Sequence, residues 1–191
     1  MKYLKIYQFK IVLLDTKPVV WRRIQVPESF TFWDLHCAIQ DSMGWLDYHL
    51  HCFVITDSKT GDRLEIGIPP DEDDDLGETE TIAGWNEKIA DWFTIDNSRA
   101  KYTYDFGDDW EHEVVLEAIL PRSKDVKYPV CIDGKRACPP EDCGSYPGYE
   151  DICNGRHEFQ EEYRDFDPEL FVPGDVDFED PKARLADRRV L

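Results

Sequence analysis

The stretch Tyr102-Thr-Tyr-Asp-Phe-Gly-Asp-Asp-Trp-Glu-His-Glu113 carries the strongest structural signal in this sequence. Apolar and polar residues alternate before Gly107 and alternate again from Trp110 to Leu116. Two arms of period two on either side of a glycine predict two antiparallel strands joined by a tight turn. The turn is strongly acidic, and like charges in one short segment repel one another unless solvent or a cation relieves them.

This acidic hairpin, residues 102–117, has two explanations. Carboxylates at the tip of a hairpin are commonly solvated and have no further role. They can also bind a divalent ion or transfer protons if histidines lie nearby. Such a site would be formed by a set of candidate catalytic residues: His51, Asp105, Asp109 and His112. The alternative for the histidines is a place at the edge of the core, where hydrogen bonds satisfy them.

The flanking sequence predicts further hairpins and one clear helix. Strands are expected over 3–14, 19–26, 49–55 and 63–68, bounded by Pro, Gly and Asp turns. Thr31 opens a capping box with Asp34, apolar residues follow at helical spacing to Met43, and Gly44 ends the helix. Shorter helices are expected near 149–153 and 158–166, and residues 87–93 form either a short helix or an edge segment before the hairpin. The acidic run 71–75 is expected to be a solvated loop. This pattern predicts an α+β fold with a mostly antiparallel sheet.

Length, charge and targeting signals narrow the class of protein. The 191 residues suffice for one core, so we expect one domain over 1–173 and a loosely attached tail over 174–191. The net charge of −19 argues against direct binding to DNA or to anionic membranes, which attract clustered Lys and Arg. No apolar run reaches membrane-spanning length, and lysines at 2, 5 and 10 interrupt any signal-like segment. A cytoplasmic protein is therefore expected.

The six cysteines are expected to be thiols or metal ligands, because a cytoplasmic setting disfavours disulfides. Four of them occupy a Pro- and Gly-rich stretch without periodicity, and they are Cys131, Cys138, Cys143 and Cys153. Four thiolates in such a stretch could bind a structural zinc ion or another divalent metal. Because the spacing is not two Cys-x2-Cys pairs, simple packing of the thiols is the alternative.

Five motifs follow one another along the chain. They are Pro-Val-Val-Trp-Arg-Arg (18–23), His-Leu-His-x-Phe (49–53), Tyr-Asp-Phe-Gly-Asp-Asp-Trp-Glu-His (104–112), Cys-Pro-Pro-Glu-Asp-Cys-Gly (138–144) and Gly-Tyr-Glu (148–150). Together they resemble the plasmid pRiA4b ORF-3-like family over about residues 3–171. The resemblance implies a compact, roll-like α+β domain, found on plasmids and beside insertion elements, where some members carry a resolvase-like label. It implies no established activity.

The residues do not support recombination chemistry. A serine recombinase needs a nucleophilic serine among several arginines and a basic DNA-binding helix, whereas the arginines here are few and mostly distant from serines. We expect a cytoplasmic binding or accessory module, often linked with mobile elements, whose partner is an unknown protein or small ligand. The alternative is a metal-dependent enzyme with a His/Asp site around the acidic hairpin, which would require its candidate residues to share one pocket.

Overall fold

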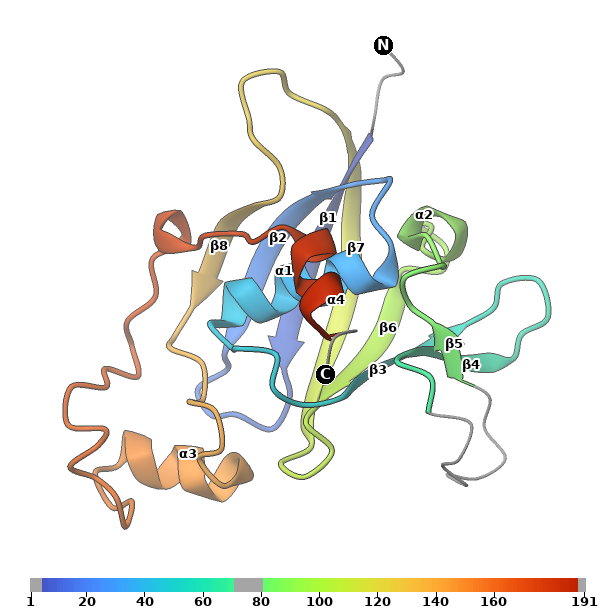
Figure 1. Ribbon diagram of the computed structural model, residues 1–191. Helices are drawn as coiled ribbons and strands as arrows, with labels where there is room; N and C mark the ends of the chain where they lie inside the picture. Colours follow the sequence, from blue (N-terminus) through green and yellow to red (C-terminus); the bar gives the residue numbers. More distant parts are fainter. Residues whose placement is uncertain (1–4, 71–80, 189–191) are drawn as a thin grey trace.

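One large sheet organises the chain (Figure 1). The computed structural model describes residues 5–70 and 81–188. The strands are β1 (Lys5–Leu13), β2 (Trp21–Pro27), β3 (His51–Thr56), β4 (Arg63–Gly67), β5 (Thr81–Ala83), β6 (Arg99–Tyr104), β7 (Trp110–Pro121) and β8 (Val130–Lys135). They lie in the order β5-β4-β3-β6-β7-β1-β2-β8, and only the pair of β4 and β5 is parallel. The predicted α+β class with a mostly antiparallel sheet is confirmed.

Helices α1 (Phe32–Met43) and α4 (Pro181–Arg188) lie over one face of this sheet (Figure 1). The other helices are α2 (Ile89–Trp92) and α3 (Ser145–Cys153), with a 3-10 turn η1 (Pro173–Asp175). Figure 1 shows α1 and α4 in front of the sheet and α3 beyond its lower end. Buried and part-exposed residues alternate along β2 and the first half of β7, so the core lies on the α1 side. Within the described ranges, no helix has both the length and the apolar character needed to cross a membrane.

The first helix begins and ends where its sequence signals lie. The side chain of Thr31 accepts a hydrogen bond from the Asp34 amide at 3.2 Å, and the Asp34 carboxylate accepts one from the Thr31 amide at 2.8 Å. Gly44 has φ +88° and donates its amide to the Gln40 carbonyl at 2.8 Å. A left-handed residue at this position favours glycine because other side chains are strained there. The capping box and the glycine stop are both confirmed.

The acidic hairpin is also confirmed. β6 and β7 pair from Arg99↔Val115 to Tyr104↔Trp110, and residues 105–109 make the turn. The turn is closed by a backbone hydrogen bond of 2.6 Å from the Asp109 amide to the Asp105 carbonyl.

Several elements were not expected from the sequence. The short strand β5, the strand β8 and the helix α4 had no prediction, while 158–166 forms turns rather than the expected helix. The described part of the segment expected to be a loose tail makes specific contacts with α1. Trp33 Nε1 donates to the Pro181 carbonyl at 2.8 Å, and Arg184 Nη2 lies 2.6 Å from an oxygen of Asp41. The acidic run 71–75 lies outside the described residues.

His112 belongs to the core rather than to the surface of the hairpin. It is fully buried, its ring centroid lies 5.2 Å from that of Tyr102, and the Trp45 ring packs edge-on at 5.4 Å. Burial lowers the pKa of His112 to about 3. Nδ1 lies 3.3 Å from the Tyr102 carbonyl, while Nε2 has no hydrogen-bond partner among the described residues. This environment suits a neutral imidazole that donates from Nδ1, not the proton transfer considered from the sequence.

Removing the N-cap of α1 tests how the helix begins. We expect Thr31→Ala to lower the free energy of unfolding by about 1 kcal/mol, because the Asp34 amide loses its acceptor. Urea denaturation of both proteins measures the difference. Thr31→Ser keeps the hydroxyl and should stay close to wild type, whereas equal losses in both variants would contradict the capping role.

The buried imidazole of His112 makes stability depend on pH. Its folded pKa of about 3 lies below the ordinary value of 6.5, so the unfolded chain binds the proton more readily. This contribution is therefore fully present above pH 6.5 and is lost as the pH falls towards 3. At about 1.36 kcal/mol per pKa unit, it amounts to roughly 2 kcal/mol between pH 6.5 and 5.

The expected result is a shallower loss of stability on acidification in His112→Leu than in wild type, measured by urea denaturation at several pH values. His157→Gln changes a part-exposed histidine and should keep the wild-type slope. Identical slopes in wild type and His112→Leu would show that His112 is not buried in the neutral form.

Candidate metal centre

Three segments that are distant in the sequence meet at one end of the sheet. His49 precedes β3, Asp105 follows β6, and Asp142 lies in the loop before α3. One ligand atom from each residue lies within 4.8 Å of the other two. Each residue belongs to a different motif, namely 49–53, 104–112 and 138–144. We call His49, Asp105 and Asp142 the triad.

The imidazole of His49 stands between the two carboxylates. Its Nε2 lies 3.0 Å from Oδ1 of Asp142 and 3.7 Å from Oδ2 of Asp105. The Asp105 side chain is 10% exposed and that of Asp142 is 68% exposed. One carboxylate is thus held inside the protein, while the other closes the triad from the solvent side.

Hydrogen bonds of the turn orient the Asp105 carboxylate towards His49. Its Oδ1 accepts a hydrogen bond from the Gly107 amide at 2.9 Å, which leaves Oδ2 directed at His49. The Asp105 amide donates to the Leu50 carbonyl at 2.9 Å and ties the turn to the segment that carries His49. Asp105 and Asp142 have φ of 54° and 53°, a left-handed conformation that aspartate tolerates better than most residues. Such conformations often occur at functional sites.

Glu141, the neighbour of Asp142 in the loop 138–144, fixes this loop beside the triad. Glu141 Oε1 accepts hydrogen bonds from the Leu46 amide at 2.7 Å and from the Tyr104 hydroxyl at 3.0 Å. Burial raises the pKa of Glu141 and also that of Tyr104. The Tyr104 ring lies edge-on to His49, with the ring centroids 5.8 Å apart. These contacts hold the loop with Asp142 against the end of the sheet.

The three side chains of the triad form a set of ligands with a recognisable chemistry. An imidazole nitrogen and two carboxylate oxygens suit borderline and hard divalent ions such as Zn²⁺ and Mn²⁺. An ion between them would neutralise two carboxylates that approach the same imidazole. Asp142 also lines an open cavity of about 670 Å³, together with Cys143, His157 and Tyr163. An ion at the triad would therefore lie at the border of a cavity large enough for a small molecule.

His51 does not join the carboxylates of the hairpin turn but lies in a second group with His36 and Asp47, all of them buried. The rings of His36 and His51 stack with centroids 3.5 Å apart, and His36 Nε2 lies 2.9 Å from Oδ1 of Asp47. The other nitrogen of His36 lies 2.9 Å from the Tyr102 hydroxyl. This group is a buried polar network between α1, which carries His36, and β3, which begins at His51.

The structure therefore separates the candidate residues that were named from the sequence. Asp105 belongs to the triad, His51 to the network under α1, and His112 to the core. Asp109 is exposed on the hairpin turn, and its carbonyl accepts a hydrogen bond from the Tyr146 hydroxyl at 3.2 Å. Among the described residues these four side chains do not form one ligand group.

The four cysteines proposed as zinc ligands are also spread out. Within residues 5–70 and 81–188, no three of their sulfur atoms lie within 4.8 Å of one another. Cys131, Cys138 and Cys143 are buried, and burial raises the pKa of all three thiols, to about 12 for Cys143. These surroundings favour the protonated thiol. Zinc binding by these cysteines stays a prediction.

Sequence reasoning missed His49 and Asp142 as partners of Asp105. Both stand in quoted motifs, and the predicted strand 49–55 contains His49 as well as His51, but only His51 was named as a candidate. Asp142 lies in a loop without periodicity, so its distance from the hairpin has no local signal. The available signal was that three motifs of one family each contain an acidic residue or a histidine.

Comparisons with known proteins agree with this fold. Residues 5–180 match the family described as plasmid pRiA4b ORF-3-like protein, so the match passes the expected boundary at 173. The chain is 30% identical over 151 residues to the uncharacterized protein y4hQ of Sinorhizobium fredii, covering 78% of this chain and 71% of that protein.

A solved structure is also similar. It is the crystal structure of MM3350, a protein of unknown function from Methanosarcina mazei Go1, with 45% identity and a TM-score of 0.82. The alignment covers 93% of this chain and 100% of that one. With the family match over most of its length, the chain belongs to the plasmid pRiA4b ORF-3-like family.

Proposed function

We propose that this protein is a divalent-cation-binding accessory domain whose ion is bound by His49, Asp105 and Asp142. The observation that carries the proposal is the convergence of one ligand atom from each residue within 4.8 Å. Three motifs of one family contribute these residues, and each residue lies in a different connection between elements.

The electrostatics support the proposal. Two carboxylates beside one imidazole repel each other, and this repulsion is strongest where water is excluded. Asp105 is buried, and Arg or Lys forms no ion pair with it or with Asp142 in the described part of the chain. A bound cation would replace the missing positive charge and would let His49 coordinate as a neutral ligand.

The ligands also indicate which ions to test. Asp and His without thiolate favour Mn²⁺ and Zn²⁺ over soft ions. With three protein ligands, a four- to six-coordinate ion keeps sites for water or for a ligand from the adjacent cavity.

Titration with Mn²⁺ and Zn²⁺ tests the proposal. We expect one equivalent of ion to bind by calorimetry to protein purified without an affinity metal. Asp105→Asn should weaken binding by at least about 10- to 100-fold, since even residues that only support ligands cost that much. Asp142→Asn should weaken it less, because its carboxylate is exposed to solvent.

Asp109→Asn is the matched control, because it removes the same charge from the same turn and also has a positive φ. It should bind the ion as wild type does. If Asp105→Asn and Asp109→Asn weakened ion binding equally, the effect would come from the overall negative charge of the hairpin and not from coordination by Asp105. No ion binding at millimolar concentration would refute the proposal.

A metal-dependent enzyme is the second candidate, favoured by the cavity of about 670 Å³ that Asp142 borders. A divalent ion there could lower the pKa of a bound water and provide a nucleophile near a small substrate. Hydrolysis of phosphate and carboxylate esters in the presence of Mn²⁺ tests this role. If ester hydrolysis were lost in Asp105→Asn and kept in Asp109→Asn, the protein would be an enzyme rather than an accessory domain.

The partner of the domain belongs to the same proposal. A net charge of −19 repels the phosphate backbone, so we propose a protein or a small ligand as partner and not duplex DNA. An accessory role beside mobile elements, as the family resemblance implies, would then act through another protein. The cytoplasm is the compartment proposed for it.

A further inference from the structure

A buried guanidinium lies on β2, which β1 separates from β7 of the acidic hairpin. Arg22, on β2, is 1% exposed. Its guanidinium carbon lies 3.6 Å from the centroid of the Phe171 ring, so the ring covers one face of the cation. Gly134 on β8 makes room for this contact, because a Cβ there would lie 2.4 Å from the Phe171 ring.

The hydrogen bonds of Arg22 satisfy only part of its guanidinium. Nε donates to the Ser42 carbonyl at 2.7 Å, and Nη1 donates to the carbonyls of Trp21 at 2.9 Å and Lys135 at 3.1 Å. Arginine has five N–H donors, so the two on Nη2 are left. Nη2 makes no hydrogen bond with a described residue, and no described carboxylate forms an ion pair with Arg22.

An uncompensated buried cation is costly. Burial lowers the pKa of Arg22, and the titratable groups that act on it are the thiols of Cys138 and Cys131 and the hydroxyl of Tyr149. Burial raises the pKa of both thiols, so they remain neutral and supply no counter-charge. Neutral carbonyls supply only part of the stabilisation that an anion would give.

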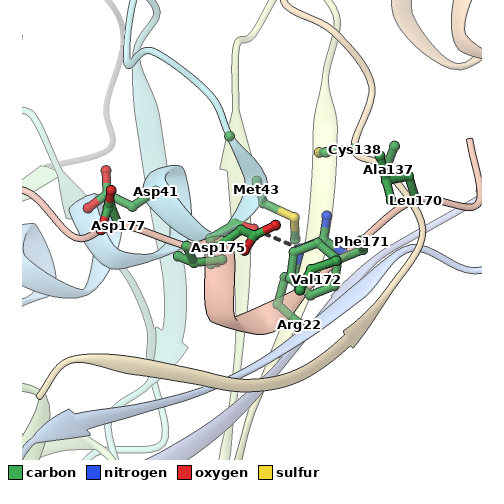
Figure 2. A pocket seen from close by; sticks show the side chains of 13 residues that line it. Arg22, Asp41, Met43, Ala137, Cys138, Leu170, Phe171, Val172, Asp175 and Asp177 are labelled. Carbon is green, nitrogen blue, oxygen red and sulfur yellow. Dashed lines mark hydrogen bonds between the residues drawn. The ribbon is translucent and has the colours of Figure 1, made fainter. Parts of the chain in front are cut away.

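Arg22 lines a cavity of about 370 Å³. Apolar side chains make up much of its wall, and they are Met43, Ala137, Leu170, Phe171, Val172 and Val176. Figure 2 shows Met43 and Phe171 beside Arg22, with Cys138, Ala137 and Leu170 grouped on one side. Asp41 and Asp177 are on the other side of this view (Figure 2), and Asp41 is paired with Arg184.

We propose that this cavity binds a small organic carboxylate, whose charged end accepts a hydrogen bond from Arg22 Nη2 and whose apolar body lies along Met43 and Val176. This site is separate from the triad and does not rest on the proposed metal function. Two of the family's motifs form it, because Arg22 lies in 18–23 and Cys138 in 138–144.

The lining selects against other anions. Inorganic phosphate and nucleotides carry more negative charge than a monocarboxylate, and Asp175 and Asp177 on the rim would repel them more strongly. They would also leave the apolar walls in contact with water. A monocarboxylate with a short alkyl chain satisfies both the cation and the walls. A free carboxylic acid and the C-terminus of a peptide present this same group.

Methyl NMR of methionine provides a direct readout. The chain has two methionines, Met1 and Met43, so protein with ¹³C-methyl methionine gives one signal in the cavity and one reference. The probes are hexanoate, N-acetylnorleucine, hexanol and inorganic phosphate, added without divalent metal so that no carboxylate can bind an ion at the triad. Tighter binding of N-acetylnorleucine than of hexanoate would indicate a peptide C-terminus as the source.

We expect both carboxylates to shift the Met43 signal with saturation, and hexanol and phosphate to leave it in place. Asp175→Asn removes an exposed charge at the rim and should tighten hexanoate binding by about two- to fivefold. Asp165→Asn is the matched control, because it removes the same charge from a side chain that is 94% exposed and does not line the cavity.

Arg22→Gln should abolish the shift, but it also removes hydrogen bonds from the fold. Asp175→Asn keeps Arg22 intact and therefore tests the proposal even if Arg22→Gln does not fold. A Met43 signal that hexanoate leaves unchanged at millimolar concentration would overturn the proposal. Equal shifts by hexanol and hexanoate, saturation by phosphate alone, or equal effects of Asp175→Asn and Asp165→Asn would also overturn it.

Discussion

The register between β3 and β6 is the constraint on which the candidate metal centre depends. His51 pairs with Tyr104 at the end of this ladder, and the hydrogen bond from the Asp105 amide to the Leu50 carbonyl extends the contact beyond it. Side chains alternate along a strand, so a slip of one residue would exchange the buried and exposed sets. The observed register keeps His51 against α1 and brings His49 to Asp105 at the end of the sheet.

Two sites in this protein concentrate charges of opposite sign. The triad gathers two carboxylates around an imidazole, while Arg22 is a buried cation without a carboxylate partner among the described residues. The loop 138–144 connects the two, because Cys138 lines the Arg22 cavity and Asp142 belongs to the triad. Gly148 allows α3 to approach this loop, since a Cβ there would lie 1.8 Å from the Cys143 carbonyl oxygen. A cation bound at the triad and an anion bound at Arg22 would balance these charges.

Local signals predicted the elements that local interactions determine. The capping box at Thr31, the stop at Gly44 and the acidic hairpin follow from side-chain chemistry within a few residues. β8 was missed because Gly134 and neighbouring polar residues interrupt its alternation, and pairing with β2 decides its conformation. The triad could be predicted only in part. Asp105 was named, but its pairing with His49 and Asp142 depends on tertiary contacts that no spacing in the sequence encodes.

Anomalous X-ray scattering from crystals grown with Mn²⁺, and separately with Zn²⁺, tests the central claim most directly. The account predicts one strong anomalous peak within coordination distance of His49 Nε2, Asp105 Oδ2 and Asp142 Oδ1. A peak at the cysteines of 131–153 instead would return the metal to the thiolates that the sequence first suggested. If the protein bound one equivalent of ion in solution but the crystals showed no anomalous peak at the triad, the account would be contradicted.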